Sequence, residues 1–263
     1  MPGATSSAVH ALVVEDQRGH VHRLVLRRFT DAEWLAYEPD LAAREAEALV
    51  LLEATPLATP KLIGADANGE HCDVPAILMT RLAGRPSAAP EDIDRFVARL
   101  AEPLPLVHAV PPSDAIPEYQ PYDLGRARRG ELRPPPGSRH ARAWERAIEV
   151  HIGAPPTGRA VFLHRDYHPG NVLWRGGRVI GVVDWVNASR GPADADLGQC
   201  RYNLALDYGL DAAKQFLAAH RALTGARDYD PYWDIVAAVG MQPEFVEREE
   251  AADEFLARAV ARL

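Results

Sequence analysis

The most constraining feature of this sequence is a set of three short apolar runs that follow one another in its second half. They span residues 160–163, 172–174 and 178–183. Each run is too short for a helix and is rich in Val, Leu and Ile, which is typical of a buried strand. Helical patterns lie on both sides of these runs. The sequence therefore predicts a mixed α and β fold.

Polar residues stand at the ends of these runs. Asp166 and Asn171 lie in the loop between the first two runs, and Asp184 follows the third. Neighbouring strands would bring all three to one cleft. Phosphoryl transfer needs an aspartate near the attacking hydroxyl and oxygen ligands that hold Mg²⁺ against the phosphates. The pattern predicts a kinase-like site with Asp166 as the catalytic residue and Asn171 and Asp184 as metal ligands.

Two other interpretations of this stretch remain open. In the first, the loop is only a polar turn, and the aspartates pair with Arg165 and Arg178. In the second, His164 and His168 bind zinc together with Asp184. That His-x3-His spacing would need a helix, and the Pro-Gly pair that follows His168 breaks one.

The same stretch resembles the aminoglycoside phosphotransferase and choline kinase-like family, which is related to the protein kinases. The family pattern is HGDxHxxNVL, then VxDW, then GxPxxDL. Residues 164–173 read HRDYHPGNVL, residues 183–185 read VDW, and residues 191–197 read GPADADL. Trp185 stands where protein kinases have Phe-Gly, which favours the small-molecule branch.

This resemblance implies a bilobal, protein kinase-like α+β fold. Residues 1–82 would form a small β-rich nucleotide-binding lobe, and residues 83–263 a larger, mainly helical catalytic and substrate lobe. It also implies that Asp196 holds the catalytic loop through hydrogen bonds and that His164 packs behind the metal site.

The resemblance further implies that ATP or GTP binds between the lobes with Mg²⁺. Arg27, on an early strand, would grip the α- and β-phosphates, and Glu45 on the next helix would fix it. Lysine is more usual than arginine at the Arg27 position. The alternative is that Arg27 is a solvated strand residue and that Glu45 is a surface acid paired with Arg44 or Lys61.

Two weaker matches concern the rest of the nucleotide. Residues 3–7 resemble the small-residue loop that covers the phosphates, so the hydroxyls of Ser6 and Ser7 are candidate donors. Residues 75–82 resemble the strand and hinge whose backbone binds adenine, which makes Met79 and Arg81 candidate contacts. An unstructured N-terminus and an ordinary buried strand explain these residues equally well.

The other elements follow from periodicity and turn residues. Two β-rich runs, 9–14 and 21–29, flank a turn at 16–19 and predict a hairpin. A helix should begin after Asp40, which is a candidate cap. Further strands are expected at 61–63 and 76–79, a connection at 82–86, and a long loop at 111–137. The helices expected in the second lobe span residues 93–110, 141–150, 195–206, 211–223, 232–239 and 244–263, and Pro103 and Pro105 interrupt the first of them.

Composition narrows the functional classes. A net charge of −8 argues against a general nucleic-acid binder. No apolar run reaches the roughly 18 residues that span a bilayer, and we see no signal peptide. The two cysteines, Cys72 and Cys200, are compatible with a reducing cytoplasm, where we expect the protein to act.

The acceptor is not encoded in any motif. We favour a small hydroxyl compound of aminoglycoside type, which the resemblance links to antibiotic resistance. The acids within residues 244–254 raise the hypothesis of a cationic acceptor, although such runs are usually a solvated helix face. The alternatives are a metabolic kinase for choline, homoserine or a sugar, and a catalytically silent nucleotide-binding module. A protein kinase would carry Asp-Phe-Gly and Ala-Pro-Glu, which are missing. No pattern identifies the oligomeric state.

Overall fold

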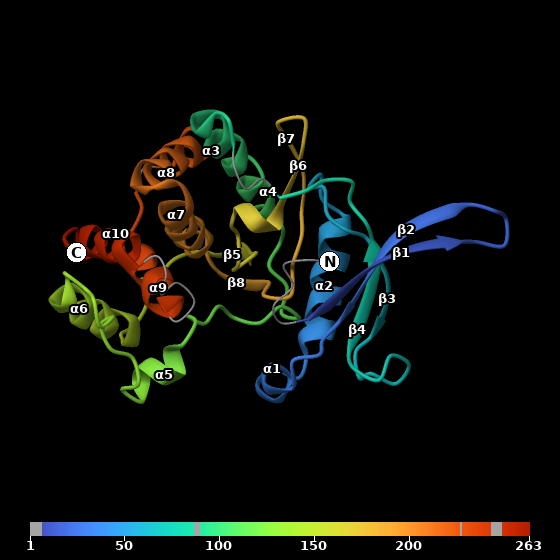
Figure 1. The fold of residues 1–263 in the computed structure, drawn as a ribbon, viewed down its shortest axis with the longest axis horizontal. Helices are drawn as coiled ribbons and strands as arrows, with labels where there is room; N and C mark the ends of the chain where they lie inside the picture. Colours follow the sequence, from blue (N-terminus) through green and yellow to red (C-terminus); the bar gives the residue numbers. More distant parts are fainter. Residues whose placement is uncertain (1–6, 87–89, 227, 243–248) are drawn as a thin grey trace.

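The computed structural model describes residues 7–86, 90–226, 228–242 and 249–263. It has a β-rich N-terminal lobe and a mainly helical C-terminal lobe (Figure 1), which is the bilobal α+β fold that the resemblance implied. The N-terminal lobe contains β1 Ala8–Glu15, β2 Val21–Arg28, α1 Ala32–Tyr37, α2 Leu41–Glu53, β3 Leu62–Asp66 and β4 Ala76–Thr80. The C-terminal lobe contains α3 Ile93–Ala101, α4 Leu104–His108, α5 Leu124–Arg128, α6 Ala141–Ile152, β5 Ala160–Leu163, the 3₁₀ turn Pro169–Asn171, β6 Val172–Arg175, β7 Arg178–Val182, β8 Ser189–Pro192, α7 Asp194–Tyr208, α8 Leu210–Thr224, α9 Tyr232–Gly240 and α10 Glu249–Val260.

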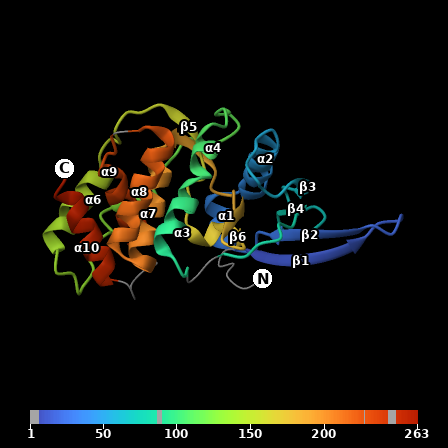
Figure 2. The same ribbon diagram turned by 90° about the horizontal axis from the view of Figure 1, so that it is seen from above.

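The N-terminal sheet is antiparallel, with strand order β1-β2-β4-β3. The predicted hairpin is present: Ala8 pairs with Arg28, and Glu15 pairs with Val21. Its turn is closed by Asp16, whose carboxylate accepts backbone N–H groups, and by Gly19 at φ +82°. The hairpin projects away from the body of the protein (Figure 2).

Helix α2 packs on this sheet through its apolar face, which includes Leu41, Leu49 and Leu52. Glu45 lies on the same buried face and is only 1% exposed. Asp40 occupies the N-cap position, as predicted, but its side chain makes no capping hydrogen bond. Its carboxylate instead accepts a hydrogen bond from Arg44. The apolar periodicity predicted the helix. It could not predict the contact of Asp40, because that contact depends on the side chain of Arg44.

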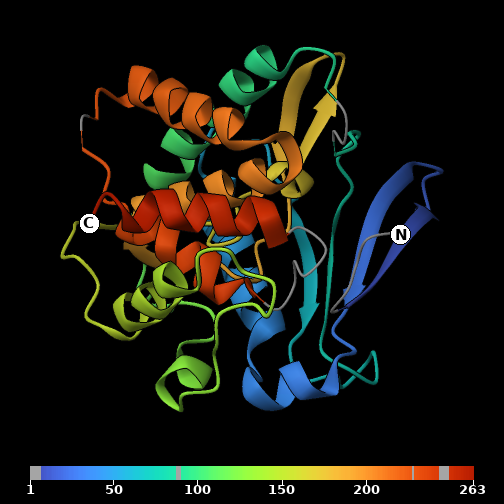
Figure 3. The same cartoon turned by 60° about the vertical axis from the view of Figure 1, so that its left-hand side comes forward.

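The C-terminal lobe contains two small antiparallel sheets, β5 with β8 and β6 with β7. The hairpin of β6 and β7 lies between the N-terminal sheet and the large helices (Figure 3). Its register pairs Val172 with Val182, and the N–H of Val183 donates to the carbonyl of Asn171. Because Asp184 follows Val183, this pairing brings it next to Asn171.

The segment that joins the lobes packs closely on these strands. Arg85 and Trp174 form an antiparallel bridge. A Cβ on Gly84 would lie 2.6 Å from Cδ1 of Ile180 and 2.9 Å from Cβ of Leu173, so a larger residue there would require these side chains or the connection to shift. The connection expected at 82–86 is therefore held on the C-terminal lobe by backbone hydrogen bonds and a close approach.

Helices form most of the C-terminal lobe, and its core continues into the N-terminal lobe. Helix α7 is buried along most of its length and packs against α8 and α9, while α10 packs on α6, α7 and α9. Among the described residues, no helix combines the length and the apolar composition needed to span a bilayer.

Several predicted boundaries need correction. The interruption predicted within 93–110 divides this stretch into two helices, α3 and α4; Pro103 precedes α4, whereas Pro105 lies in its first turn. The long loop expected at 111–137 contains the short helix α5. Helix α1 and strand β8 were not predicted. The last helix is described only from Glu249, and residues 244–248 lie outside the described residues.

A buried carboxylate near the start of α7 fixes the loop after β5. Asp196 is fully buried. Its Oδ2 accepts the backbone N–H of His164 at 3.0 Å, and its Oδ1 accepts that of Arg165 at 2.6 Å. Nε2 of His108 lies 3.0 Å from the same Oδ2. The predicted hydrogen bonding of Asp196 to this loop is therefore present.

Replacing this carboxylate should destabilise the protein. In Asp196→Ala two buried N–H groups lose their acceptor, so we expect a loss of about 3–5 kcal/mol in the free energy of unfolding, measured by urea denaturation. Asp196→Asn keeps one acceptor oxygen and should lose about half as much. The exposed Glu53→Ala should change stability by less than about 0.5 kcal/mol. A loss below about 1 kcal/mol in Asp196→Ala would contradict the anchoring role.

Candidate active site

The catalytic aspartate predicted from sequence is held by two amide groups. Nδ2 of Asn171 donates to the backbone carbonyl of Asp166 at 2.9 Å and to its Oδ2 at 3.2 Å. Nε2 of Gln199, on α7, donates to Oδ1 at 3.1 Å. Burial raises the pKa of Asp166, which the charge of Asp184 reinforces and His168 opposes. The carboxylate is thus oriented at both oxygens.

His164 lies behind this loop rather than in the cleft. It is fully buried and packs on the ring of Trp185, with centroids 4.5 Å apart. Its Nδ1 accepts the N–H of Asp166 at 3.3 Å, and its Nε2 donates to the carbonyl of Val183 at 2.9 Å. These two bonds are satisfied together when the proton is on Nε2. His164 therefore links the loop that carries Asp166 to the strand that leads to Asp184.

Arg165 adopts an unusual backbone conformation, with φ +66°. Only glycine reaches this region without steric cost, which explains why glycine stands here in the family pattern. The arginine side chain contacts the segment of residues 119–122. Its guanidinium donates to the carbonyl of Gln120 at 2.9 Å and lies 4.3 Å from the ring centroid of Tyr122. These contacts offset part of the backbone strain.

A buried cluster in the N-terminal lobe reaches Asp184. Nη1 of Arg27 donates to Glu45 at 3.0 Å and to Oδ1 of Asp184 at 2.6 Å. Nε of Arg27 donates to the hydroxyl of Ser7 at 2.9 Å. Glu45 therefore pairs with Arg27 rather than with Arg44 or Lys61. Ser6 lies outside the described residues.

Burial raises the pKa of Glu45 to about 7, while the positive charge of Arg27 opposes this shift. The same glutamate also accepts the backbone N–H of Trp185 at 3.3 Å. Glu45 thus contacts both the cation from β2 and the segment that carries Asp184. A single side chain of α2 connects the two lobes at the site.

Two side-chain oxygen atoms of this site are available to bind Mg²⁺. Among the described residues, no hydrogen bond or ion pair uses Oδ2 of Asp184 or Oδ1 of Asn171. The Asp184 side chain is 36% exposed. Mg²⁺ usually takes one or two carboxylates together with phosphates and water. The donor set fits such an ion.

The zinc interpretation has no support in the described part of the chain, where no group of three or more His, Cys, Asp or Glu is placed to hold an ion. His168 has a local role instead. Its Nδ1 accepts the N–H of Gly170 at 3.2 Å, and its Nε2 lies 4.0 Å from Oδ2 of Asp166.

The two residues predicted to contact adenine differ in position. Met79 is buried in the core, paired with Val25 and Leu62 in the sheet. Arg81 lines a cavity of about 470 Å³ beside the connection between the lobes. The N–H of Arg81 already donates to the carbonyl of Arg23. A base bound here would have to use other backbone groups of residues 79–85.

Two residues of the site were missed at the level of sequence. Gln199 follows Asp196 by three residues on α7, so both lie on the helix face that meets the catalytic loop. That spacing is a signal that could have identified it. His108 gave no such signal, because it reaches Asp196 from 88 positions away.

Known proteins resemble the chain along nearly its whole length. The profile of the phosphotransferase enzyme family (APH) matches residues 4–259. A comparison with curated protein sequences gives no match. Among solved structures, a macrolide 2′-phosphotransferase type I is 23% identical, with 98% of this chain and 90% of that chain covered and a TM-score of 0.61.

Two further structures contain nucleotides. A thermostable mutant of the aminoglycoside phosphotransferase APH(4)-Ia, in a ternary complex with ADP and hygromycin B, is 14% identical, with 99% and 92% coverage and a TM-score of 0.66. The GDP complex of a mutant aminoglycoside 2′-phosphotransferase-IIIa is 19% identical, with 99% and 91% coverage and a TM-score of 0.63. These likenesses show the kinase-like fold, and the family match shows a kinase-type enzyme that phosphorylates hydroxyl groups. This chain belongs to the phosphotransferase enzyme family.

Proposed function

We propose that the protein transfers the γ-phosphoryl group of ATP or GTP to a hydroxyl of a small molecule, with an aminoglycoside-like acceptor favoured. The observation that carries this proposal is the pair of amide groups on Asp166. A carboxylate held at both oxygens can orient an acceptor hydroxyl and accept its proton.

On the nucleotide side, Arg27 contacts the α- and β-phosphates in this proposal, and Glu45 fixes its guanidinium. Ser6 and Ser7 belong to the loop that covers the phosphates. Asn171 and Asp184 hold Mg²⁺, which when bound would neutralise charge on the phosphates. Residues 1–82 form the nucleotide-binding lobe and residues 83–263 the catalytic and substrate lobe.

On the acceptor side, three observations guide the choice. The net charge of −8 is compatible with a cationic compound. The acids of α10 give this little support, because Asp253 accepts hydrogen bonds from Ser138 and Trp144 inside the protein. A choline cage on the rings of Tyr119 and Tyr122 is disfavoured, since the guanidinium of Arg165 already lies over both rings.

The principal test uses Asp166→Asn, which keeps the shape of the side chain and removes the base. We expect kcat to fall by about 10²–10⁴-fold, with nucleotide affinity nearly unchanged. ADP release should be measured with aminoglycosides, macrolides, choline, homoserine and sugars. The matched control is Asp211→Asn, at the exposed start of α8, which should keep full activity.

The same assay separates the alternatives. Turnover with choline, homoserine or a sugar alone would identify a metabolic kinase. Nucleotide binding without turnover on any acceptor would favour the silent module. Unchanged turnover in Asp166→Asn would contradict the assigned base.

A second variant tests the role of Gln199 through the pH dependence of the reaction. Its N–H stabilises the ionised form of Asp166, so Gln199→Met should raise the pKa of that carboxyl. Because the base acts when deprotonated, the acidic limb of kcat/KM against pH should move to higher pH.

Gln215→Met, the same change on α8, is the matched control and should leave the profile in place. A merely structural role for Gln199 would lower stability without moving the acidic limb, and that result would argue against direct positioning of Asp166.

A further inference from the structure

A cavity of about 470 Å³ lies beside the connection between the lobes, and its size is usual for a small-molecule site. Three segments line it: Arg23 of β2, residues 81–85 at the connection, and Trp174 with Arg175 of β6. Both lobes therefore contribute to its walls. The residues assigned above to catalysis, to Mg²⁺ and to the nucleotide phosphates are not part of this lining.

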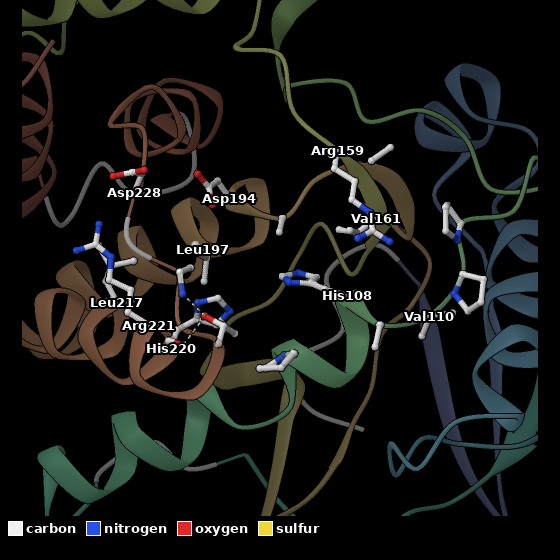
Figure 4. Close-up of a pocket in the computed structure, with 18 residues that line it drawn as sticks. His108, Val110, Arg159, Val161, Asp194, Leu197, Leu217, His220, Arg221 and Asp228 are labelled. Carbon is white, nitrogen blue, oxygen red and sulfur yellow. Dashed lines mark hydrogen bonds between the residues drawn. The ribbon is translucent and has the colours of Figure 1, made fainter.

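The lining carries a local excess of positive charge. Its four arginines are Arg23, Arg81, Arg85 and Arg175. Among the described residues, no aspartate or glutamate lines this cavity. The cavity of about 590 Å³ beside α4 and α8 differs, because Asp194 and Asp228 line it together with two arginines (Figure 4). Over the whole chain acids outnumber Lys and Arg by 37 to 29, so the excess at the connection does not follow from composition.

The four guanidinium groups are accessible and unpaired. All four arginines of the lining are exposed. Within the described part of the chain, none of their side chains forms a hydrogen bond or an ion pair. Each guanidinium has five N–H donors and no acceptor. The cavity thus offers many free donors, and no carboxylate of its lining competes for them.

Backbone hydrogen bonds fix the positions from which these side chains extend. The N–H of Arg81 donates to the carbonyl of Arg23 at 3.0 Å. The N–H of Arg85 donates to the carbonyl of Trp174 at 3.2 Å, and the N–H of Trp174 donates to the carbonyl of Arg85 at 2.8 Å. Arg175 follows Trp174 on the same strand. The backbone therefore holds like charges around one cavity, where a bound anion would reduce their repulsion.

Phosphate chemistry fits this set of donors. A guanidinium binds two phosphate oxygens in a charge-assisted, bidentate contact. One phosphate group would leave much of the charge uncompensated, because the arginines come from three segments. A short phosphate chain carries several charges and can reach more than one of these segments. A volume of about 470 Å³ suits such a small anion better than an acidic protein surface.

We propose that this cavity binds a compact inorganic oligophosphate, a chain of two or three phosphate groups. Arg23 of the first lobe and Arg175 of the second contact the chain from opposite sides of the connection, together with Arg85. The bound anion therefore joins the two lobes. This site does not depend on the function proposed above.

The test is calorimetric titration of the full chain with tripolyphosphate and with orthophosphate. Magnesium is left out because oligophosphates bind it, and the salt concentration is about 150 mM, which screens distant charges. Each additional guanidinium contact adds charge-assisted hydrogen bonds, so tripolyphosphate should bind at least about tenfold more tightly than orthophosphate. Saturating ADP, established by a separate titration, should leave the affinity for tripolyphosphate unchanged.

Variants locate the binding. Arg85→Gln and Arg175→Gln should each weaken tripolyphosphate binding by about tenfold. The matched control is Arg178→Gln. Arg178 pairs with Arg175 in the hairpin of β6 and β7 and is also exposed, but it does not line the cavity. This variant should keep nearly the full affinity. All three side chains are exposed, so the variants should fold normally.

Four results would overturn the proposal. The first two are no saturable binding of tripolyphosphate and equal binding of orthophosphate. The third is an equal loss in Arg178→Gln and Arg175→Gln, which would indicate diffuse attraction to surface charge. The fourth is displacement by ADP, which would assign the cavity to the nucleotide. An absence of ADP binding would count against the proposed function alone, because the two variants of the hairpin still decide this proposal.

Discussion

The guanidinium of Arg27 is the contact on which the geometry between the lobes depends. It lies between Glu45 of α2 and Asp184 of the second lobe, and it is only 6% exposed. Removing the Arg27 cation from water costs free energy, and its contacts with two carboxylates offset that cost. Replacing a buried ion-pair cluster with apolar side chains often leaves stability unchanged, so the main effect of this cluster is to position the lobes. It fixes how the sheet of the first lobe meets the strands that end at the site.

The loop that carries Asp166 is fixed from the other side. Asp196 holds its backbone, and His164 joins it to the carbonyl of Val183. Both Arg165 and Asp184 have positive φ, at +66° and +69°. Non-glycine residues keep a positive φ only when surrounding contacts hold the backbone in that conformation. The carboxylate of Asp196 provides such a contact at Arg165, and the guanidinium of Arg27 provides one at Asp184.

Much of this site could be predicted from sequence because its parts are local. Asp166 and Asn171 share one loop, and Asp184 ends a strand whose pairing partner begins just after Asn171. The family resemblance located Arg27 and Glu45. The contact of Gln199 with Asp166 was not foreseen, since it joins residues 33 positions apart on different elements. The engaged N–H of Arg81 also escaped prediction, because it depends on how β2 continues past its last sheet pair with β4.

Two histidines that line the cavity of about 590 Å³ beside α4 and α8 show how tertiary context decides the role of a residue type. His108 and His220 lie with their ring centroids 6.3 Å apart, and both line the cavity. His108 has an acceptor in Asp196 and so becomes part of the scaffold behind the catalytic loop. His220 has none among the described residues, and an unsatisfied buried polar group costs about 1–3 kcal/mol. A leucine would fill the same space without that cost. The same residue type is thus stabilised at position 108 by its acceptor and lacks that stabilisation at position 220.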